Sequence, residues 1–131
     1  MPREDLLEVE VVDPIVESKS EIKPILLEEK QTVVHCSMPC QIGMGARIWK
    51  STYLITDGGT KIPLLFWDGI SQAPYWTIIE HNGFFKFTLF FGGLPNDCKT
   101  FTLKEEIPEP GGFEVKGIRR NKTDVYRVTV I

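Results

Sequence analysis

The sequence predicts an all-β domain in which short antiparallel strands form two facing sheets. Hydrophobic residues alternate with polar ones at a period of two, and not at the 3.6-residue period of a helix. Turn residues punctuate the chain at short intervals, most clearly at Asp57-Gly58-Gly59 and at Asn82-Gly83. Short strands separated by turns, with no convincing helix, are typical of a sandwich or a barrel.

Eight or nine strands are expected. In chain order they cover residues 7–11, 25–27, 32–38, 46–55 with an interruption at 50–51, 62–66, 84–91, 99–104, 113–118 and 125–131. The side chains expected to point inward are Val34, Cys36, Met38, Phe85, Phe87, Leu89, Phe91, Phe101 and Leu103. A strand that is apolar on one side and mixed on the other suits the interior of a sandwich.

Composition and charge indicate one folded domain with an acidic beginning. The chain has 131 residues, of which 42% are hydrophobic and 25% charged, and its formal net charge is −3. That charge argues against a nucleic-acid partner, which normally faces a basic surface. Residues 1–30 hold nine acidic and four basic side chains, whereas the remainder holds nine and eleven. We therefore expect an acidic, flexible lead-in over residues 1–20 and a single domain over residues 21–131, with a docking tail as the alternative for the lead-in.

Targeting signals are not evident. The chain begins with Met1-Pro2-Arg3-Glu4-Asp5 and has no apolar region of the kind that a secretory signal requires. No stretch approaches the roughly 18 apolar residues of a membrane span. We expect a protein without a membrane span, cytoplasmic as the sequence stands or exported if a leader has been removed. Sheet edges invite pairing between chains, so we expect a monomer or a weak dimer.

Several stretches resemble one group of β-sandwich domains. The matching residues are Ser51-Thr52-Tyr53-Leu54-Ile55, Pro63-Leu64-Leu65, Asp68-Gly69-Ile70, Phe87-Thr88-Leu89-Phe90-Phe91, Leu94-Pro95, Lys99-Thr100-Phe101 and Gly112-Phe113-Glu114-Val115-Lys116-Gly117-Ile118. They resemble the immunoglobulin-like β-sandwich domains that precede thioredoxin-like domains in exported Bacteroidetes proteins. The resemblance covers residues 25–118. It implies an immunoglobulin-like antiparallel β-sandwich of about eight strands, a bacterial source and no catalysis of its own.

This chain departs from that group in two ways. Residues 105–110 stand where the relatives usually carry an acidic turn that often contains cysteine. The 131 residues include no thioredoxin-like domain, and the redox chemistry of such a domain is therefore not carried over to this chain.

The segment Cys36-Ser37-Met38-Pro39-Cys40 is a candidate for thiol or metal chemistry, although its spacing is not the CxxC of redox sites and zinc knuckles. With Cys98 and a histidine, these thiols could hold zinc or copper, which thiolate and imidazole suit. A regular strand points His35 and Cys36 to opposite faces, and cysteine is often a buried apolar filler. We therefore expect buried thiols, no metal and no cofactor. A disulfide or a metal site with Cys36 and Cys40 as ligands remains the alternative.

Candidates for catalysis are few. The chain has two histidines, His35 and His81, no Gly-x-Ser-x-Gly elbow, and no Ser or Cys with an evident His–Asp partner. Glu105 and Glu106 are adjacent, so a strand would point them in opposite directions and they make a poor acid–base pair. We expect that the protein is not an enzyme, with a hydrolase assembled across the fold as the alternative.

The aromatic residues Trp49, Trp67, Tyr75 and Trp76 lie in or beside expected loops. Exposed aromatic rings offer a large rigid contact area to a protein partner or to a sugar ring. The alternative is that they cover the open ends of the sandwich. We expect Trp67 in the core and the pair Tyr75-Trp76 on the surface.

The leading functional hypothesis is a non-catalytic binding or accessory module that engages a protein through loop aromatics or an exposed sheet edge. Carbohydrate recognition by Trp49, Tyr75 and Trp76 is one alternative. A thiol-redox or metal accessory protein that uses Cys36 and Cys40 is another.

Overall fold

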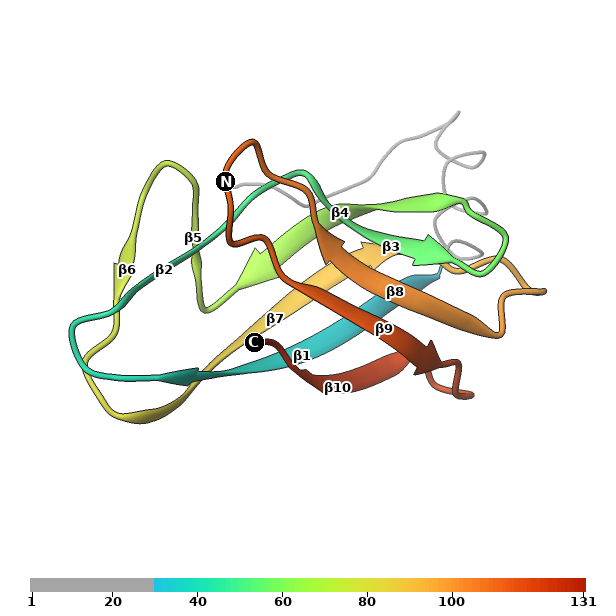
Figure 1. Cartoon of the computed structure of the whole chain (residues 1–131). Helices are drawn as coiled ribbons and strands as arrows, with labels where there is room; N and C mark the ends of the chain where they lie inside the picture. The colour runs from blue at the N-terminus through green and yellow to red at the C-terminus, as the bar shows by residue number, and fades with distance from the viewer. Residues whose placement is uncertain (1–29) are drawn as a thin grey trace, which may run out of the picture. The chain divides into compact units, whose positions relative to one another are not determined.

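The computed structural model describes residues 30–131, which form an all-β structure without a helix (Figure 1). The strands are β1 (Gln31–Cys40), β2 (Gly45–Ile48), β3 (Thr52–Thr56), β4 (Lys61–Asp68), β5 (Ser71–Gln72), β6 (Thr77–Ile78), β7 (Gly83–Gly92), β8 (Thr100–Glu105), β9 (Glu114–Arg119) and β10 (Val125–Thr129). The predicted all-β class is confirmed. Within this part of the chain nothing is long, helical and apolar enough to cross a membrane.

The expected strands from residue 32 onward all have a counterpart. The one expected at 46–55 is divided into β2 and β3 by a short turn. β5 and β6, with two residues each, are not expected from the sequence, because so short a strand shows no alternation. The strands expected at residues 7–11 and 25–27 lie outside the described residues, as does the lead-in at 1–20.

Seven strands form one mixed sheet in the order β10-β1-β7-β4-β3-β8-β9, and this sheet curls until it is nearly closed (Figure 1). The predicted antiparallel sandwich differs from it in two respects. β10 pairs with β1 in parallel, and the strands form one continuous sheet and not two clearly separate ones. Alternation along a strand shows which face is buried, but it says nothing about the partner or its direction. A small second sheet, in the order β5-β2-β6, lies at one end (left in Figure 1).

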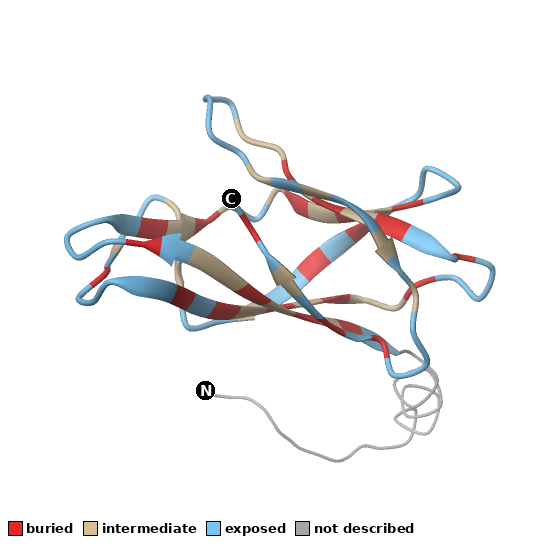
Figure 2. Cartoon of the chain, turned by 60° about the horizontal axis from the view of Figure 1, so that its bottom comes forward, coloured by how far each residue is buried: buried red, intermediate tan, exposed pale blue. Residues whose placement is uncertain are grey.

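The core follows the alternation along each strand, visible as red bands that interrupt the paler ones in Figure 2. All the expected inward side chains are buried except Met38, which is partly buried against the core. The largest fully buried apolar side chains are Phe91, Phe101, Ile48, Leu54, Ile79, Leu89, Leu103, Val34 and Val130. The two ends of the sheet meet through this core, because the ring of Phe101 in β8, the strand next to the edge strand β9, lies edge to face with the ring of Tyr126 in the edge strand β10, with the centroids 4.9 Å apart.

The edge strand β9 carries a bulge. Lys116 and Gly117 lie opposite the single residue Thr102, and Gly117 has a φ of +70°, which glycine adopts far more readily than other residues. A bulge of this kind interrupts the row of free backbone groups along an edge and discourages pairing with another chain.

A polar cluster fixes the turn that leads into β10. The guanidinium of Arg120 donates two hydrogen bonds of 3.0 Å to the carboxylate of Asp124, and the hydroxyl of Tyr126 donates a third of 2.8 Å. The backbone N–H of Val33 in β1 donates to the carbonyl of Asp124 at 2.9 Å. This cluster therefore sets where β10 begins to run beside β1.

Truncation of a core leucine should measure how much the curled sheet depends on its interior. Leu103→Ala removes a side chain with no exposed surface and should lower the free energy of unfolding by about 2–5 kcal/mol in guanidinium denaturation. Leu65→Ala is the matched control, because Leu65 is half exposed and its loss should cost about 0.5 kcal/mol or less. Equal losses in the two variants would contradict the described core.

Candidate functional site

Three segments meet at one end of the domain, namely β2, the β5–β6 turn and the connection between β8 and β9. Alternation along β2 and its continuation places Gly45, Arg47 and Trp49 on one side, since Ala46 and Ile48 between them are buried. The side of β2 that faces away from the core therefore has no side chain at Gly45, the guanidinium of Arg47 next, and then the indole of Trp49.

The β5–β6 turn folds back over this side of β2 and is held there by hydrogen bonds. The backbone N–H of Ala73 donates to the carbonyl of Ile48 at 2.9 Å, and the guanidinium of Arg47 donates to the carbonyl of Pro74 at 3.1 Å. Within the turn, the N–H of Tyr75 donates to the carbonyl of Gln72 at 2.9 Å. These bonds position the next residue, Trp76, over β2.

The ring of Trp76 lies against Gly45 and Arg47. The Cζ atom of Arg47 is 3.9 Å from the centroid of the Trp76 ring and 5.4 Å from that of Trp49, so the guanidinium stacks against one indole and approaches the other. A Cβ atom at position 45 would lie 2.9 Å from Cε3 of Trp76. Glycine at this position is therefore what lets the ring approach the backbone of β2.

Beside these rings lies a hollow of about 280 Å³. Its apolar lining includes Met38, Ile70, Ile107, Phe113 and Val130. Arg47 and Glu109 form an ion pair of 3.7 Å among the residues around it. The hollow is therefore lined largely by apolar side chains, with one charged pair at its border.

Glu105 also borders this hollow and is only 7% exposed. Its Oε2 atom accepts a hydrogen bond of 3.2 Å from the backbone N–H of Trp49. Burial raises the pKa of this carboxyl, while the hydrogen bonds from Trp49 and Phe113 and the charge of Arg47 oppose the rise. Glu105 thus fixes the start of the loop that carries Trp49.

Of the predicted ligand-binding residues, Trp49 and Trp76 are brought to the same hollow, whereas Tyr75 stands beside it with 74% of its surface exposed. We call Arg47, Trp49, Tyr75 and Trp76 the aromatic end. Sequence reasoning missed Arg47, although its place between Gly45 and Trp49 in the alternation of β2 was a usable signal. Trp67, expected in the core, is partly buried against it.

The thiols Cys36, Cys40 and Cys98 are all free and buried. β1 runs unbroken from Gln31 to Cys40, so the Cα atoms of Cys36 and Cys40 are about 13 Å apart, well beyond disulfide range. Burial raises the pKa of Cys36 to about 12 and also raises that of Cys98. Such thiols stay protonated at neutral pH and are poor nucleophiles and poor metal ligands.

In the described part of the chain, neither histidine ring joins these thiols in a common site. His35 points to the opposite face of β1 from Cys36, with Nδ1 2.9 Å from the hydroxyl oxygen of Thr88. His81 donates from Nε2 to the carbonyl of Phe84 at 2.9 Å in the turn before β7. Among residues 30–131 no three His, Cys, Asp or Glu side chains are grouped as a metal site would require.

Comparison with known protein families, with curated proteins and with solved structures gives no match. The resemblance to the Bacteroidetes sandwich domains therefore stays a prediction, and the arguments for function rest on the residues themselves.

The thiols provide a direct test of the site geometry. In native protein, iodoacetamide should label Cys36 and Cys98 slowly, because both are buried and protonated. After unfolding in denaturant without reductant, mass spectrometry should find all three cysteines alkylated. Rapid native labelling, or a thiol that reacts only after reduction, would instead favour the thiol-redox alternative.

The raised pKa of Glu105 can be tested through the pH dependence of the free energy of unfolding. Because its pKa in the folded state lies above that in the unfolded chain, its contribution to stability is greatest at low pH and is lost as the pH rises through the folded-state pKa. Glu105→Gln, which keeps an oxygen for the N–H of Trp49, should therefore gain stability over the parent protein between pH 4 and pH 7 in denaturant titrations.

The adjacent residue is the matched control. The hydrogen bond from Lys61 lowers the pKa of Glu106, so Glu106→Gln should show the opposite sign and lose stability relative to the parent as the pH rises. A Glu105→Gln variant that loses stability toward pH 7 would show that the buried carboxylate is favourable as an ion.

Proposed function

We propose that this chain is a non-catalytic binding module that recognises another protein through the aromatic end. The observation that carries the proposal is the stacking of Trp76 on Arg47 at 3.9 Å, beside a second tryptophan and an apolar hollow. Tryptophan and arginine in partly desolvated positions are the residues that most often dominate the energy of protein interfaces. Here both are ordered before a partner arrives, which reduces the entropy lost on binding.

Exposed apolar side chains on the same segments support a protein partner. Ile42 and Met44 in the β1–β2 loop are 65% and 41% exposed, and Ile78 in β6 is 59% exposed. Hydrogen bonds from Gly43 to Ile79 and from Ile79 to Met44 join that loop to the chain after β6. Exposed apolar groups gathered around an aromatic centre are typical of interaction surfaces. Aliphatic side chains suit a protein partner better than a sugar.

Carbohydrate binding is the second candidate, favoured by one observation. Trp76 is 55% exposed and its neighbour Tyr75 is 74% exposed, so both rings offer free area on which a sugar could stack.

For the fold we propose an immunoglobulin-like sandwich related to the Bacteroidetes domains that the sequence resembles. The pairing of β4 supports this grouping, because its first residues pair with β3 and its last residues pair with β7. Divided at β4, the curled sheet becomes a layer of β10, β1, β7 and β4 and a layer of β4, β3, β8 and β9.

The test is a selection of peptides from a displayed library with the full chain, followed by calorimetric titration of the peptides obtained. Trp76→Ala should weaken their binding about 30-fold or more, as expected for an interface residue worth at least 2 kcal/mol. Gly45→Ala should also weaken binding without removing any contact residue, because the new Cβ displaces the ring of Trp76.

Phe66→Ala is the matched control, since Phe66 is an aromatic residue of 60% exposure on β4 and lies outside the hollow. Its binding should stay within about twofold of the parent protein. Selected peptides that bind the Trp76→Ala variant unchanged would overturn the proposal. A glycan-array signal lost in Trp76→Ala, with no peptide selected, would favour the carbohydrate candidate.

A further inference from the structure

The outer face of β10, β1 and β7 carries two rows of polar side chains that the aromatic end does not use. In register, His35 lies opposite Arg127 on one side and Thr88 on the other. One step along β1, Ser37 lies opposite Thr129 and Lys86. One arginine, one lysine, one histidine and three hydroxyl side chains are thus placed on neighbouring strands by backbone pairing.

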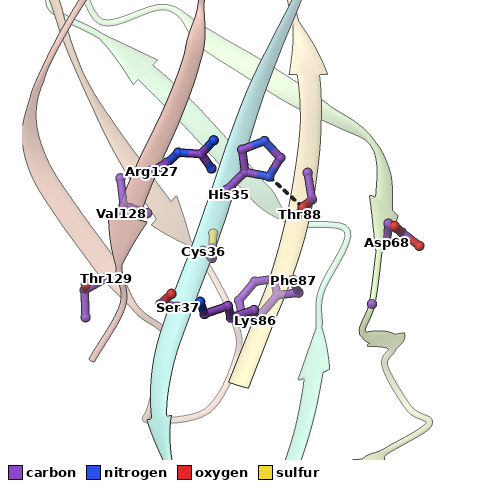
Figure 3. A pocket seen from close by; sticks show the side chains of 11 residues that line it. His35, Cys36, Ser37, Asp68, Lys86, Phe87, Thr88, Arg127, Val128 and Thr129 are labelled. Carbon is purple, nitrogen blue, oxygen red and sulfur yellow. Dashed lines mark hydrogen bonds between the residues drawn. The ribbon is translucent and has the colours of Figure 1, made fainter. Parts of the chain in front are cut away.

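These six side chains line a hollow of about 390 Å³ (Figure 3). Figure 3 shows the guanidinium of Arg127 extending toward the ring of His35, and the amino end of Lys86 lying beside Ser37. Asp68 borders the hollow on β4, but its carboxylate points away from these groups. The two basic side chains therefore border the hollow, each beside a polar side chain of β1, while the carboxylate that borders it is turned aside.

The cations of this face lack counter-charges in the described chain. Within residues 30–131 neither the side chain of Arg127 nor that of Lys86 forms an ion pair or a hydrogen bond, and His35 uses one ring nitrogen toward Thr88. In the strand register the side chain of Arg127 lies opposite the imidazole of His35, and no acidic residue is paired directly with either of them. Charged donors that have no acceptor within the fold are available to an anionic ligand.

We propose that this hollow binds a phosphate- or sulfate-type oxyanion carried on a small organic ligand. A guanidinium offers a planar pair of donors to such an anion, an ammonium adds a compact charge, and the hydroxyls of Ser37 and Thr88 supply neutral donors. The volume is within the range of small-molecule sites and exceeds the need of a bare oxyanion.

The next row of the same face provides a surface for the organic part of the ligand. Val33 lies opposite Val125 and Phe90, and Phe66 lies opposite Phe90 with the ring centroids 5.7 Å apart. A half-exposed apolar row thus runs directly beside the cationic row. An aromatic or alkyl phosphate ester would contact both rows at once.

The experiment is an amide NMR titration of the full chain with phenyl phosphate, with inorganic phosphate and with phenol, at constant ionic strength and pH. Phenyl phosphate should shift the amides of residues 35–37 and 86–88 in a saturable manner and bind at least tenfold more tightly than either of its parts. Binding of inorganic phosphate with the same affinity as phenyl phosphate would show that the organic part contributes nothing and would overturn the proposal of an organic ligand. No saturable shift with any of the three would overturn the site.

Variants separate a site from general surface charge. Arg127→Gln and Lys86→Gln should each weaken phenyl phosphate binding about tenfold, the usual effect of losing one charged hydrogen bond. Lys116→Gln, an exposed cation on β9 outside the hollow, should leave binding unchanged. Equal weakening in all three variants would show nonspecific attraction and overturn the proposal.

Thermal unfolding without ligand distinguishes a binding role from a structural one. Because the side chains of Arg127 and Lys86 are exposed and have no partner among the described residues, Arg127→Gln and Lys86→Gln should unfold at about the temperature of the parent protein. A clear loss of stability in both would assign these side chains to the fold and contradict the proposal.

Discussion

The antiparallel register between β1 and β7 is the constraint on which the rest of the structure depends. The two strands pair over ten positions, from Gln31 opposite Gly92 to Cys40 opposite Gly83. A shift of one strand by a single residue would turn its buried side chains to solvent and its polar ones inward. β10 pairs with the other edge of β1, and β4 with the other edge of β7, so one register aligns the side chains of four strands. The same register therefore places the apolar side chains of these strands in the interior and the basic side chains on the outer face.

β4 shows how a single sheet can enclose that interior. Its residues Lys61 to Pro63 pair with β3, its residues from Leu64 onward pair with β7, and the register shifts between Leu64 and Phe66. An irregularity of this kind bends a strand and increases its twist, so the sheet turns a corner here. On the opposite side the sheet is joined by side chains, through the contact of Phe101 with Tyr126. A sheet closed by one bend and one side-chain contact leaves its end open, and there the inward side chains Met38 and Val130 line the hollow of the aromatic end.

The sequence predicts what each strand determines alone and misses what several strands determine together. Period-two alternation predicts that Phe85 and Leu89 face inward, and both are buried, because burial follows from the pattern within one strand. The parallel pairing of β10 with β1 joins opposite ends of the described chain, and no local pattern encodes it. In the candidate site, the exposure of Tyr75 and Trp76 follows from their place in a loop. The stacking of Trp76 on Arg47 does not, because the turn that brings them together is flanked by strands of only two residues.

Consecutive residues of the same strands serve two chemically different surfaces. Ser37 lines the cationic hollow and Met38 the aromatic one, and Thr129 and Val130 divide in the same way. What distinguishes the two surfaces is how their arginines are bonded. The guanidinium of Arg47 interacts within the domain with the carbonyl of Pro74, the carboxylate of Glu109 and two indole rings. These contacts hold Trp76 in place. Arg127 has no such bonds among the described residues, and its donors remain available to an external acceptor. Both arginines carry the same charge, and what differs is the number of their contacts within the domain. Arg47 therefore stabilises the aromatic end, whereas the donors of Arg127 are free to bind a ligand.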